Sequence, residues 1–149
     1  MIAKVEVTTL ESWRYTWREG IVPQLSRRHL QVLRDGLVNN DSRIVQGATC
    51  QPPPLQYVRD WPVEAACGLG YCGWQGDNLG TVAELEEFFA RVCFEIDQRL
   101  GEPAACRWFL NWFDETPREL MIAALLAEVE RALAQHDAYS VTEDDGEAD

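Results

Sequence analysis

Residues 81–101, TVAELEEFFARVCFEIDQRLG, decide the fold class of this chain. Thr81 followed by Glu84 has the form of a capping box, in which the two side chains satisfy backbone N–H groups at the start of a helix. Gly101 is typical of a residue that ends one. Between them apolar residues recur at helical spacing, at Val82, Leu85, Phe88, Phe89, Val92, Cys93, Ile96 and Leu100. The stretch therefore predicts an amphipathic helix with one buried face.

Two more helices are expected after Gly101. Residues 103–113, PAACRWFLNWF, are apolar on almost every side, which is typical of a buried helix. We expect its four large aromatic side chains to form the centre of the core: Trp108, Phe109, Trp112 and Phe113. Residues 116–119, TPRE, read as an N-cap, a proline in the first turn and a glutamate two residues later. They predict a third helix that ends near Gln135.

Two helices are also expected before the triple proline at residues 52–54. One ends at Gly20, and the other follows a capping Ser26 and ends near Asn39. Their apolar faces carry Leu10, Trp13 and Trp17 in the first helix, and Leu30, Leu33 and Leu37 in the second. Pro62–Leu69 is expected to be a further short helix, because proline suits the first helical turn.

Together these signals predict an all-α, compact single-domain bundle of five to six helices, whose last three helices form an antiparallel core. Ile2–Val7 alternates weakly and could be a short strand, although no second strand is apparent to pair with it. We assign residues 1–142 to this domain, with a candidate hinge at 51–54, QPPP. Residues 143–149, EDDGEAD, are expected to form a disordered acidic tail.

Charge is distributed unevenly along the chain, whose net value is −12. Residues 1–60 carry eight basic and six acidic side chains, a net charge of +2, whereas the remainder carries five basic and 19 acidic ones, a net charge of −14. Such a surface repels nucleic acid and favours a partner with a basic surface.

The cysteine content indicates the compartment. Five cysteines are an odd number, and the N-terminal residues lack the apolar core of a signal peptide, so we expect reduced thiols and a cytoplasmic protein. Leu120–Ala127, the longest near-continuous apolar run of the C-terminal part, is far shorter than the roughly 20 residues of a membrane-spanning helix. We therefore expect no membrane association.

Cys67 and Cys72 are the first candidates for a metal site. Their C-x4-C spacing lies at the loose end of zinc-ligand patterns, and no second matching pair exists to complete four ligands. Further ligands would have to come from Cys50, Cys93, Cys106, His29 or His136. We expect buried thiols instead, with no metal and no cofactor. Cys67 also falls toward the end of its expected helix, the wrong terminus to stabilise a thiolate nucleophile.

Familiar catalytic patterns are missing from the sequence. It has no G-x-x-x-x-G-K, G-x-G-x-x-G, H-E-x-x-H or G-x-S-x-G motif. Five carboxylates share residues 81–101, but Glu84 and Glu87 lie opposite the apolar stripe of that helix. We interpret these carboxylates as solvated and predict no catalytic residue.

Residues 57–80, YVRDWPVEAACGLGYCGWQGDNLG, combine aromatic side chains with glycines, which allow close backbone approach at a pocket or a tight helix junction. Tryptophan is enriched at the hot spots of protein interfaces. One interpretation is therefore a partner-binding surface made by Trp61, Tyr71, Trp74, Glu84 and Glu87. The alternative is that this segment covers the helical core as a lid, with Trp74 partly exposed.

Three functions remain open at this point. We favour a non-enzymatic cytoplasmic interaction module, an adaptor or inhibitor, whose carboxylates could compete with nucleic acid for a basic partner surface. The second is a small helical enzyme or metal-binding domain centred on Cys67 and Cys72. The third is a structural subunit of a nucleoprotein assembly, with Arg27 and Arg28 facing nucleic acid.

Overall fold

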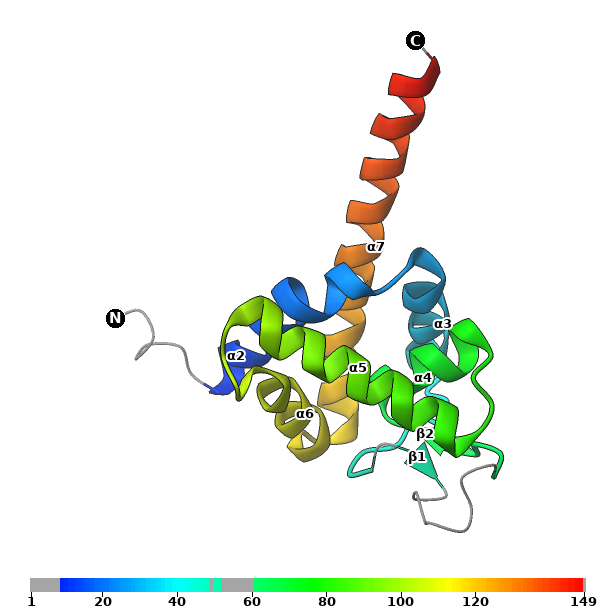
Figure 1. Ribbon diagram of the computed structural model, residues 1–149, viewed down its shortest axis with the longest axis vertical. Coiled ribbons are helices and arrows are strands. Elements are labelled where there is room, and N and C mark those ends of the chain that lie inside the picture. The colour runs from blue at the N-terminus through cyan, green and yellow to red at the C-terminus, as the bar shows by residue number, and fades with distance from the viewer. Residues whose placement is uncertain (1–8, 49, 52–60, 149) are drawn as a thin grey trace, which may run out of the picture.

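The computed structural model describes residues 9–48, 50, 51 and 61–148, and over these ranges the chain has the predicted all-α class (Figure 1). Side chains are described for residues 12–48 and 61–138. The elements in chain order are α2 (Thr9–Thr16), the π-helical η1 (Trp17–Ile21), the 3-10 helix η2 (Val22–Gln24), α3 (Arg27–Val38), β1 (Cys50–Gln51), β2 (Ala65–Ala66), α4 (Gly68–Tyr71), the π-helical η3 (Cys72–Gly76), α5 (Val82–Leu100), α6 (Ala105–Glu115) and α7 (Arg118–Ala148). The strand expected at Ile2–Val7 and most of the hinge expected at 51–54 lie outside the described residues.

Helix α5 forms as its sequence predicts. The Thr81 hydroxyl accepts a hydrogen bond from the backbone N–H of Glu84, and the Glu84 carboxylate accepts one from the N–H of Thr81, which completes the capping box. Gly101 ends the helix with φ of +62°, a left-handed conformation that glycine adopts without steric cost.

The aromatic side chains of α6 are the centre of the core, and α2 covers them. Trp13 of α2 stacks on Trp112 with ring centroids 3.6 Å apart and planes 4° from parallel. Trp17 of η1 lies 5.8 Å from Phe109. The core predicted for Phe109 and Trp112 is confirmed, since both are buried. Trp108 differs from the prediction because it is only half-buried, on the side of α6 that faces Tyr15.

The last three helices do not form the core by themselves, contrary to expectation. The most extensive helix contacts pair α2 with α6 and α3 with α7. The reason is that the apolar side of α6 needs more cover than α5 and α7 supply, and α2 provides it. The other side of α6 is exposed at Arg107, Asn111 and Asp114, so the expectation of a helix buried all round is wrong. The α3–α7 contact buries Leu30, Leu33 and Leu37 of α3 and Met121, Leu125 and Val129 of α7.

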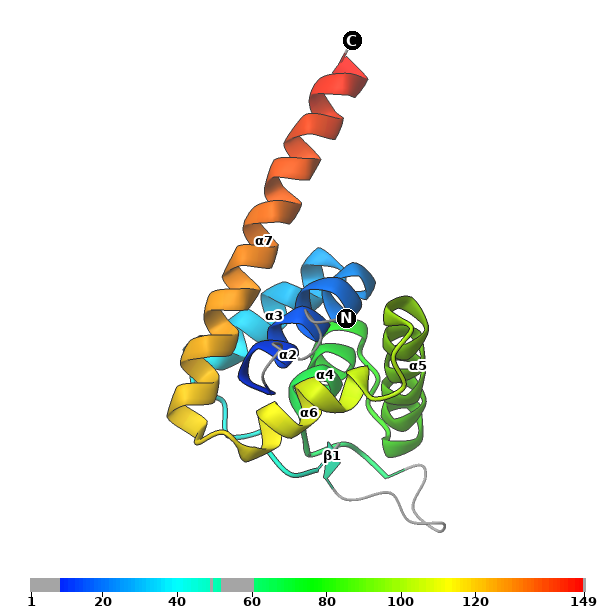
Figure 2. The ribbon, with the colours of Figure 1, turned by 90° about the vertical axis from the view of Figure 1, so that its left-hand side faces the viewer.

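Helix α7 is longer than expected. It continues past Gln135 to Ala148, and its C-terminal part projects from the body of the molecule in both views (Figures 1 and 2). Helix propagation costs little once a helix is nucleated, which explains how the backbone continues beyond its packed part. The sequence of its last turns is acidic, which the negative C-terminal end of a helix dipole does not favour. The disorder expected for 143–149 stays a prediction.

A partly buried ion-pair cluster fixes α7 to the N-terminal helices. Glu128 is buried, and both of its carboxylate oxygens accept hydrogen bonds from Arg18, at 2.9 and 2.7 Å. Arg14 donates a further bond of 3.3 Å. Hydrogen bonding from Arg18 is the main cause that lowers the pKa of Glu128.

The prediction of a helix at Pro62–Leu69 is wrong. Residues 61–66 are extended, Ala65–Ala66 pairs antiparallel with Cys50–Gln51, and helix begins only at Gly68. The physical reason is that distant partners take the backbone N–H groups: Val63 donates to Gly80 at 2.9 Å, and Ala66 donates to Arg43 at 2.8 Å. These tertiary bonds override the preference of Pro62 for a helix start.

Candidate interaction surface

The glycine-rich residues 68–76 form a tight helix junction between α3 and α5, through α4 and η3. A Cβ atom on Gly73 would lie 2.8 Å from the Phe88 ring, and one on Gly76 would lie 2.7 Å from the His29 ring. Both distances are shorter than real Cβ contacts, so glycine is what allows η3 to pack this closely. The close backbone approach expected for this segment is confirmed.

Tyr71 is buried in this junction, and its hydroxyl reaches a polar cluster that includes the exposed Arg43. Its hydroxyl donates a 2.7 Å hydrogen bond to Asp41, and the Arg43 guanidinium donates a second 2.7 Å bond to the same carboxylate. Hydrogen bonding from Arg43 holds the pKa of Asp41 well below its usual range. Burial, followed by the bond to Asp41, raises the pKa of Tyr71 to about 12. Tyr71 therefore anchors the loop after α3 and presents little surface to a partner.

Trp74 lies partly exposed over the core, as expected. Its ring meets Tyr71 edge-on at 6.1 Å, and the Arg43 guanidinium sits 5.2 Å from its centroid. It also packs against both hydrophobic clusters of the core. These contacts match the lid interpretation for Trp74.

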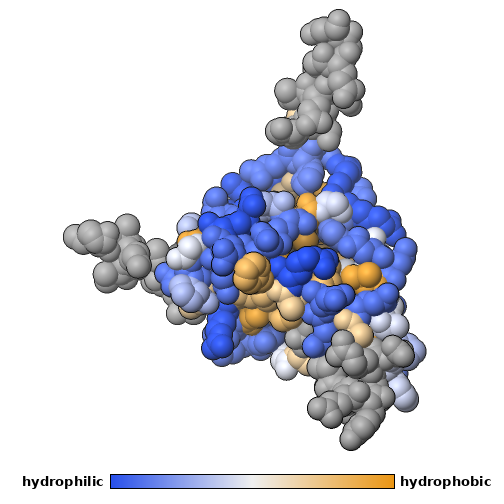
Figure 3. All heavy atoms as spheres, in the orientation of Figure 1, coloured by the Kyte–Doolittle hydropathy of each residue, from blue (hydrophilic) through white to orange (hydrophobic). Residues whose placement is uncertain are grey.

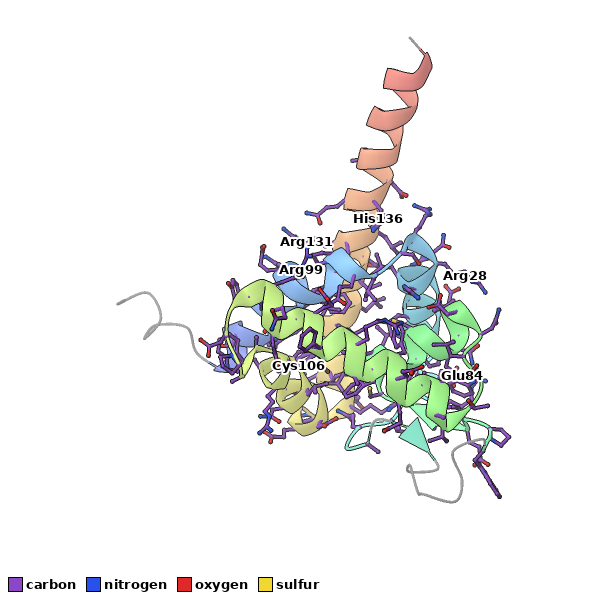
Figure 4. All side chains as sticks on the ribbon, in the orientation of Figure 1. Arg28, Glu84, Arg99, Cys106, Arg131 and His136 are labelled. Carbon is purple, nitrogen blue, oxygen red and sulfur yellow. The ribbon has the colours of Figure 1, made fainter. Side chains whose placement is uncertain are left out.

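Trp61 differs from Tyr71 and Trp74 because 48% of it is exposed. Its carbonyl accepts a 2.8 Å hydrogen bond from the N–H of Val82, and Pro62 pairs with Thr81. Trp61 is thus fixed at the N-terminal end of α5, where Figure 4 shows Glu84. Of the three predicted aromatic residues, it offers the most surface to a partner.

The outer side of α5 carries a second exposed aromatic residue that the sequence analysis did not single out. Phe94 is 62% exposed, and helical spacing places it on one side with Glu84 and Glu87. We define the α5 face by its exposed residues Glu84, Glu87, Arg91, Phe94 and Gln98. Figure 3 shows hydrophobic atoms at the surface over α5, surrounded by hydrophilic ones. The sequence did contain a signal for the exposure of Phe94, because this aromatic residue lies outside the apolar stripe of the predicted helix.

The two carboxylates predicted for a partner surface have different roles. The Glu84 side chain turns back to Thr81, where it accepts hydrogen bonds from the hydroxyl at 3.1 Å and the N–H at 3.3 Å. Glu87 is exposed on the next turn of the α5 face. Glu84 is therefore partly committed to the helix cap, while Glu87 faces solvent.

Cys67 and Cys72 are buried thiols in the structure. Cys67 occupies the N-cap of α4, and its sulfur accepts a 3.4 Å hydrogen bond from the N–H of Gly70. The sequence placed Cys67 at the opposite end of a helix, and the extended residues 61–66 explain that error. Cys72 is fully buried, and this burial raises the pKa of its thiol.

The described side chains bring together no three His, Cys, Asp or Glu groups that could hold a metal ion. His29 already has partners within the fold: its Nδ1 accepts a 3.0 Å bond from the N–H of Ser26, and its Nε2 lies 2.9 Å from a carboxylate oxygen of Asp77. Because Nδ1 accepts the bond from Ser26, it is not free to bind a metal ion. His136 lies on α7, in the lining of a surface pocket that does not contain His29.

Two surface pockets flank α7, away from the α5 face. One of about 430 Å³ lies against η1 and η2 and is lined by Arg18, Val22, Pro23, Leu25, Ala132, Gln135 and His136. The other, of about 310 Å³, lies against α3. Neither pocket is lined by a residue of the predicted protein-binding surface, although Arg27, which was expected to face nucleic acid in one alternative, lines the second pocket.

Known proteins give no further guide to this chain. No protein-family model matches it, and neither a curated protein sequence nor a solved structure matches it. Within the described residues, none of the helices has both the length and the apolar character that crossing a membrane requires.

Proposed function

We propose that this chain is a non-enzymatic interaction module, an adaptor or inhibitor in the cytoplasm, that binds a protein partner through the α5 face. The observation that carries the proposal is the 62% exposure of Phe94 on the same side of α5 as the predicted Glu84 and Glu87. Trp61, 48% exposed at the N-terminal end of the helix, extends this surface. Exposed aromatic side chains beside carboxylates are suited to anchor a partner.

The chemistry of the α5 face indicates the kind of partner. Large aromatic side chains at the centre of an interface supply most of its binding free energy. Carboxylates around them mainly raise the association rate with a surface of opposite charge. With a net charge of −12, the molecule as a whole would attract a basic partner. A nucleic-acid-binding protein whose groove accepts Glu87 in place of a phosphate is one such partner.

The contacts of the other candidate residues support this proposal over its two alternatives. Arg27 pairs with Asp137, and the Arg28 guanidinium donates a 3.1 Å hydrogen bond to the carbonyl of Gly76. Nucleic-acid binding would have to compete with these contacts. An enzyme centred on Cys67 and Cys72 would need both buried thiols to become accessible.

A photo-crosslinking experiment tests the proposal. The photoreactive amino acid p-benzoylphenylalanine would replace Phe94 in one variant and Leu120 in another, in cells that produce the protein. Leu120 of α7 is the matched control because it is 63% exposed. We expect a discrete crosslinked protein from position 94 and none from position 120. Equal crosslinking at both positions, or none at position 94, would contradict the proposal.

Affinity measurements with the crosslinked partner then separate the contribution of the aromatic Phe94 from that of the charged Glu87. Phe94→Ala should weaken binding by about 2 kcal/mol, roughly 30-fold in Kd, while Leu120→Ala should leave Kd unchanged. Glu87→Gln should lower the association rate and reduce its dependence on salt. A complex that raised salt does not weaken would argue against the basic partner.

A further inference from the structure

Cys93 and Cys106 face each other across the α5–α6 hairpin. Asp97 accepts a 3.0 Å hydrogen bond through its carboxylate from the backbone N–H of Cys106. Cys93 lies four residues before Asp97, so it occupies the same side of α5 one turn earlier. The side chain of Cys106 interacts with that of Cys93 and raises the pKa of the Cys93 thiol. Figure 4 shows Cys106 where α6 lies against α5.

Short-range bonds keep the two helices in this register. The N–H of Gly101 donates a 2.9 Å bond to the carbonyl of Asp97, and the N–H of Ala105 donates a 3.0 Å bond to Glu102. The connection between the helices is therefore a closed turn. This turn keeps Cys106, at the start of α6, beside Asp97, which lies one helical turn after Cys93.

We propose that Cys93 and Cys106 are a redox-sensitive dithiol that a peroxide converts into an intramolecular disulfide. Cys93 is the thiol that meets the oxidant, because it is only half-buried whereas Cys67, Cys72 and Cys106 are buried. The proposal is independent of the partner proposed for the α5 face.

The reaction needs hydrogen peroxide and no other reactant. The Cys93 thiolate attacks one peroxide oxygen, the O–O bond breaks, and the released hydroxide takes up a proton to leave a sulfenic acid and water. The sulfur of Cys106 then attacks the Cys93 sulfur, the S–S bond forms, and the departing hydroxide leaves as a second water with the proton of Cys106. Two thiols lose two electrons and two protons, and one peroxide becomes two waters.

The groups around Cys93 determine how fast this happens. The side-chain interaction with Cys106 is the largest influence that raises the pKa of Cys93, followed by burial and by the nearby Cys106, Cys67 and Asp97. Because only the thiolate reacts, oxidation should be slow at neutral pH and accelerate as the pH rises. The site would therefore respond to sustained oxidation rather than to a brief pulse.

Tryptic mapping of the full-length protein tests the proposal. Cleavage after Arg91, Arg99 and Arg107 releases Cys93 in residues 92–99 and Cys106 in residues 100–107, whereas Cys67 and Cys72 share residues 60–91. After treatment with hydrogen peroxide, capture of free thiols by iodoacetamide and digestion without reductant, we expect peptides 92–99 and 100–107 as one linked species. This species should be absent from Cys93→Ser and Cys106→Ser and present in Cys72→Ser.

Thermal unfolding supplies the second measurement. A disulfide that closes the short loop between these cysteines should raise Tm by about 5–10 °C, and reductant should reverse the change. A link from residues 92–99 to residues 60–91, overoxidation of Cys93 without any link, or a Tm that does not rise would each overturn the proposal. Non-reducing gels at low protein concentration would expose links between molecules, which would also count against it.

Discussion

Gly73 and Gly80 differ in their surroundings, and a matched pair of substitutions exploits that difference. A Cβ on Gly73 would lie 2.8 Å from the ring of Phe88, whereas one on Gly80 would meet nothing within 4 Å. Gly73→Ala should therefore lower the free energy of unfolding by about 1–3 kcal/mol through overpacking. Gly80→Ala should change it by less than about 0.5 kcal/mol. Urea denaturation of both variants measures the contrast, and equal effects would show that η3 is not packed as described.

Individual residues were predictable where their partners are close in sequence. The roles of Thr81 and Glu84 follow from a spacing of three residues, and the structure confirms their capping box. The anchoring role of Tyr71 could not be predicted, because it depends on Asp41, 30 residues earlier in the chain. Exposure of Phe94 follows from its position outside the apolar stripe, although recognising it required attention to the polar side of the helix.

Whole helices were likewise predictable where the residues that determine them are close in sequence. The helices α3 and α5 carry their caps and apolar stripes within one segment, so their starts were predictable. Helix α7 begins at Arg118, directly after Pro117, and the cap predicted at Thr116 stays a prediction. The segment from Pro62 to Ala66 is extended because its backbone bonds to Arg43 and Gly80, which no local pattern reveals. The π-helical η1 and η3 also lack a sequence signal of the kind that caps provide, so the sequence predicted neither.

The contact between α7 and the first helices depends on Glu128. Glu128→Gln should lower the free energy of unfolding at pH 7 by about 1–3 kcal/mol, because Arg14 and Arg18 lose a charged acceptor that is itself buried. Glu130→Gln is the control, since Glu130 is exposed and pairs with Arg34 at 3.6 Å. Its effect should stay below about 0.5 kcal/mol.

The ion pair between Glu128 and Arg18 also predicts how the free energy of unfolding depends on pH. Folding lowers the pKa of Glu128, so its contribution to stability is complete at pH values above the ordinary glutamate pKa of about 4.3. It is lost as the pH falls through the lower value of the folded state. The difference between wild type and Glu128→Gln in urea titrations should therefore shrink below about pH 4. A difference that stays constant down to pH 3 would contradict the structure.

The domain as a whole depends on contacts between its two halves. The apolar side of α6 packs against α2, which brings Trp13, and against α5, while α3 covers α7. Each large apolar side chain contributes about 1.5–3 kcal/mol when it is fully buried. Domains of this kind are stable by only about 5–15 kcal/mol in total, so loss of the N-terminal helices would exceed the available stability.

A fragment of residues 77–138, which contains α5, α6 and the packed part of α7, tests this dependence. It should lack a cooperative thermal transition and bind a dye for exposed apolar surface, because Phe109 and Trp112 lose Trp13 and Trp17 as neighbours. The control is residues 1–142, which removes only the acidic tail and should unfold cooperatively near the Tm of the full chain. Circular dichroism across temperature distinguishes the two. A cooperative transition in the short fragment would show that the last three helices form a core on their own, as the sequence first suggested, and that α2 and α3 add to a domain that is already stable.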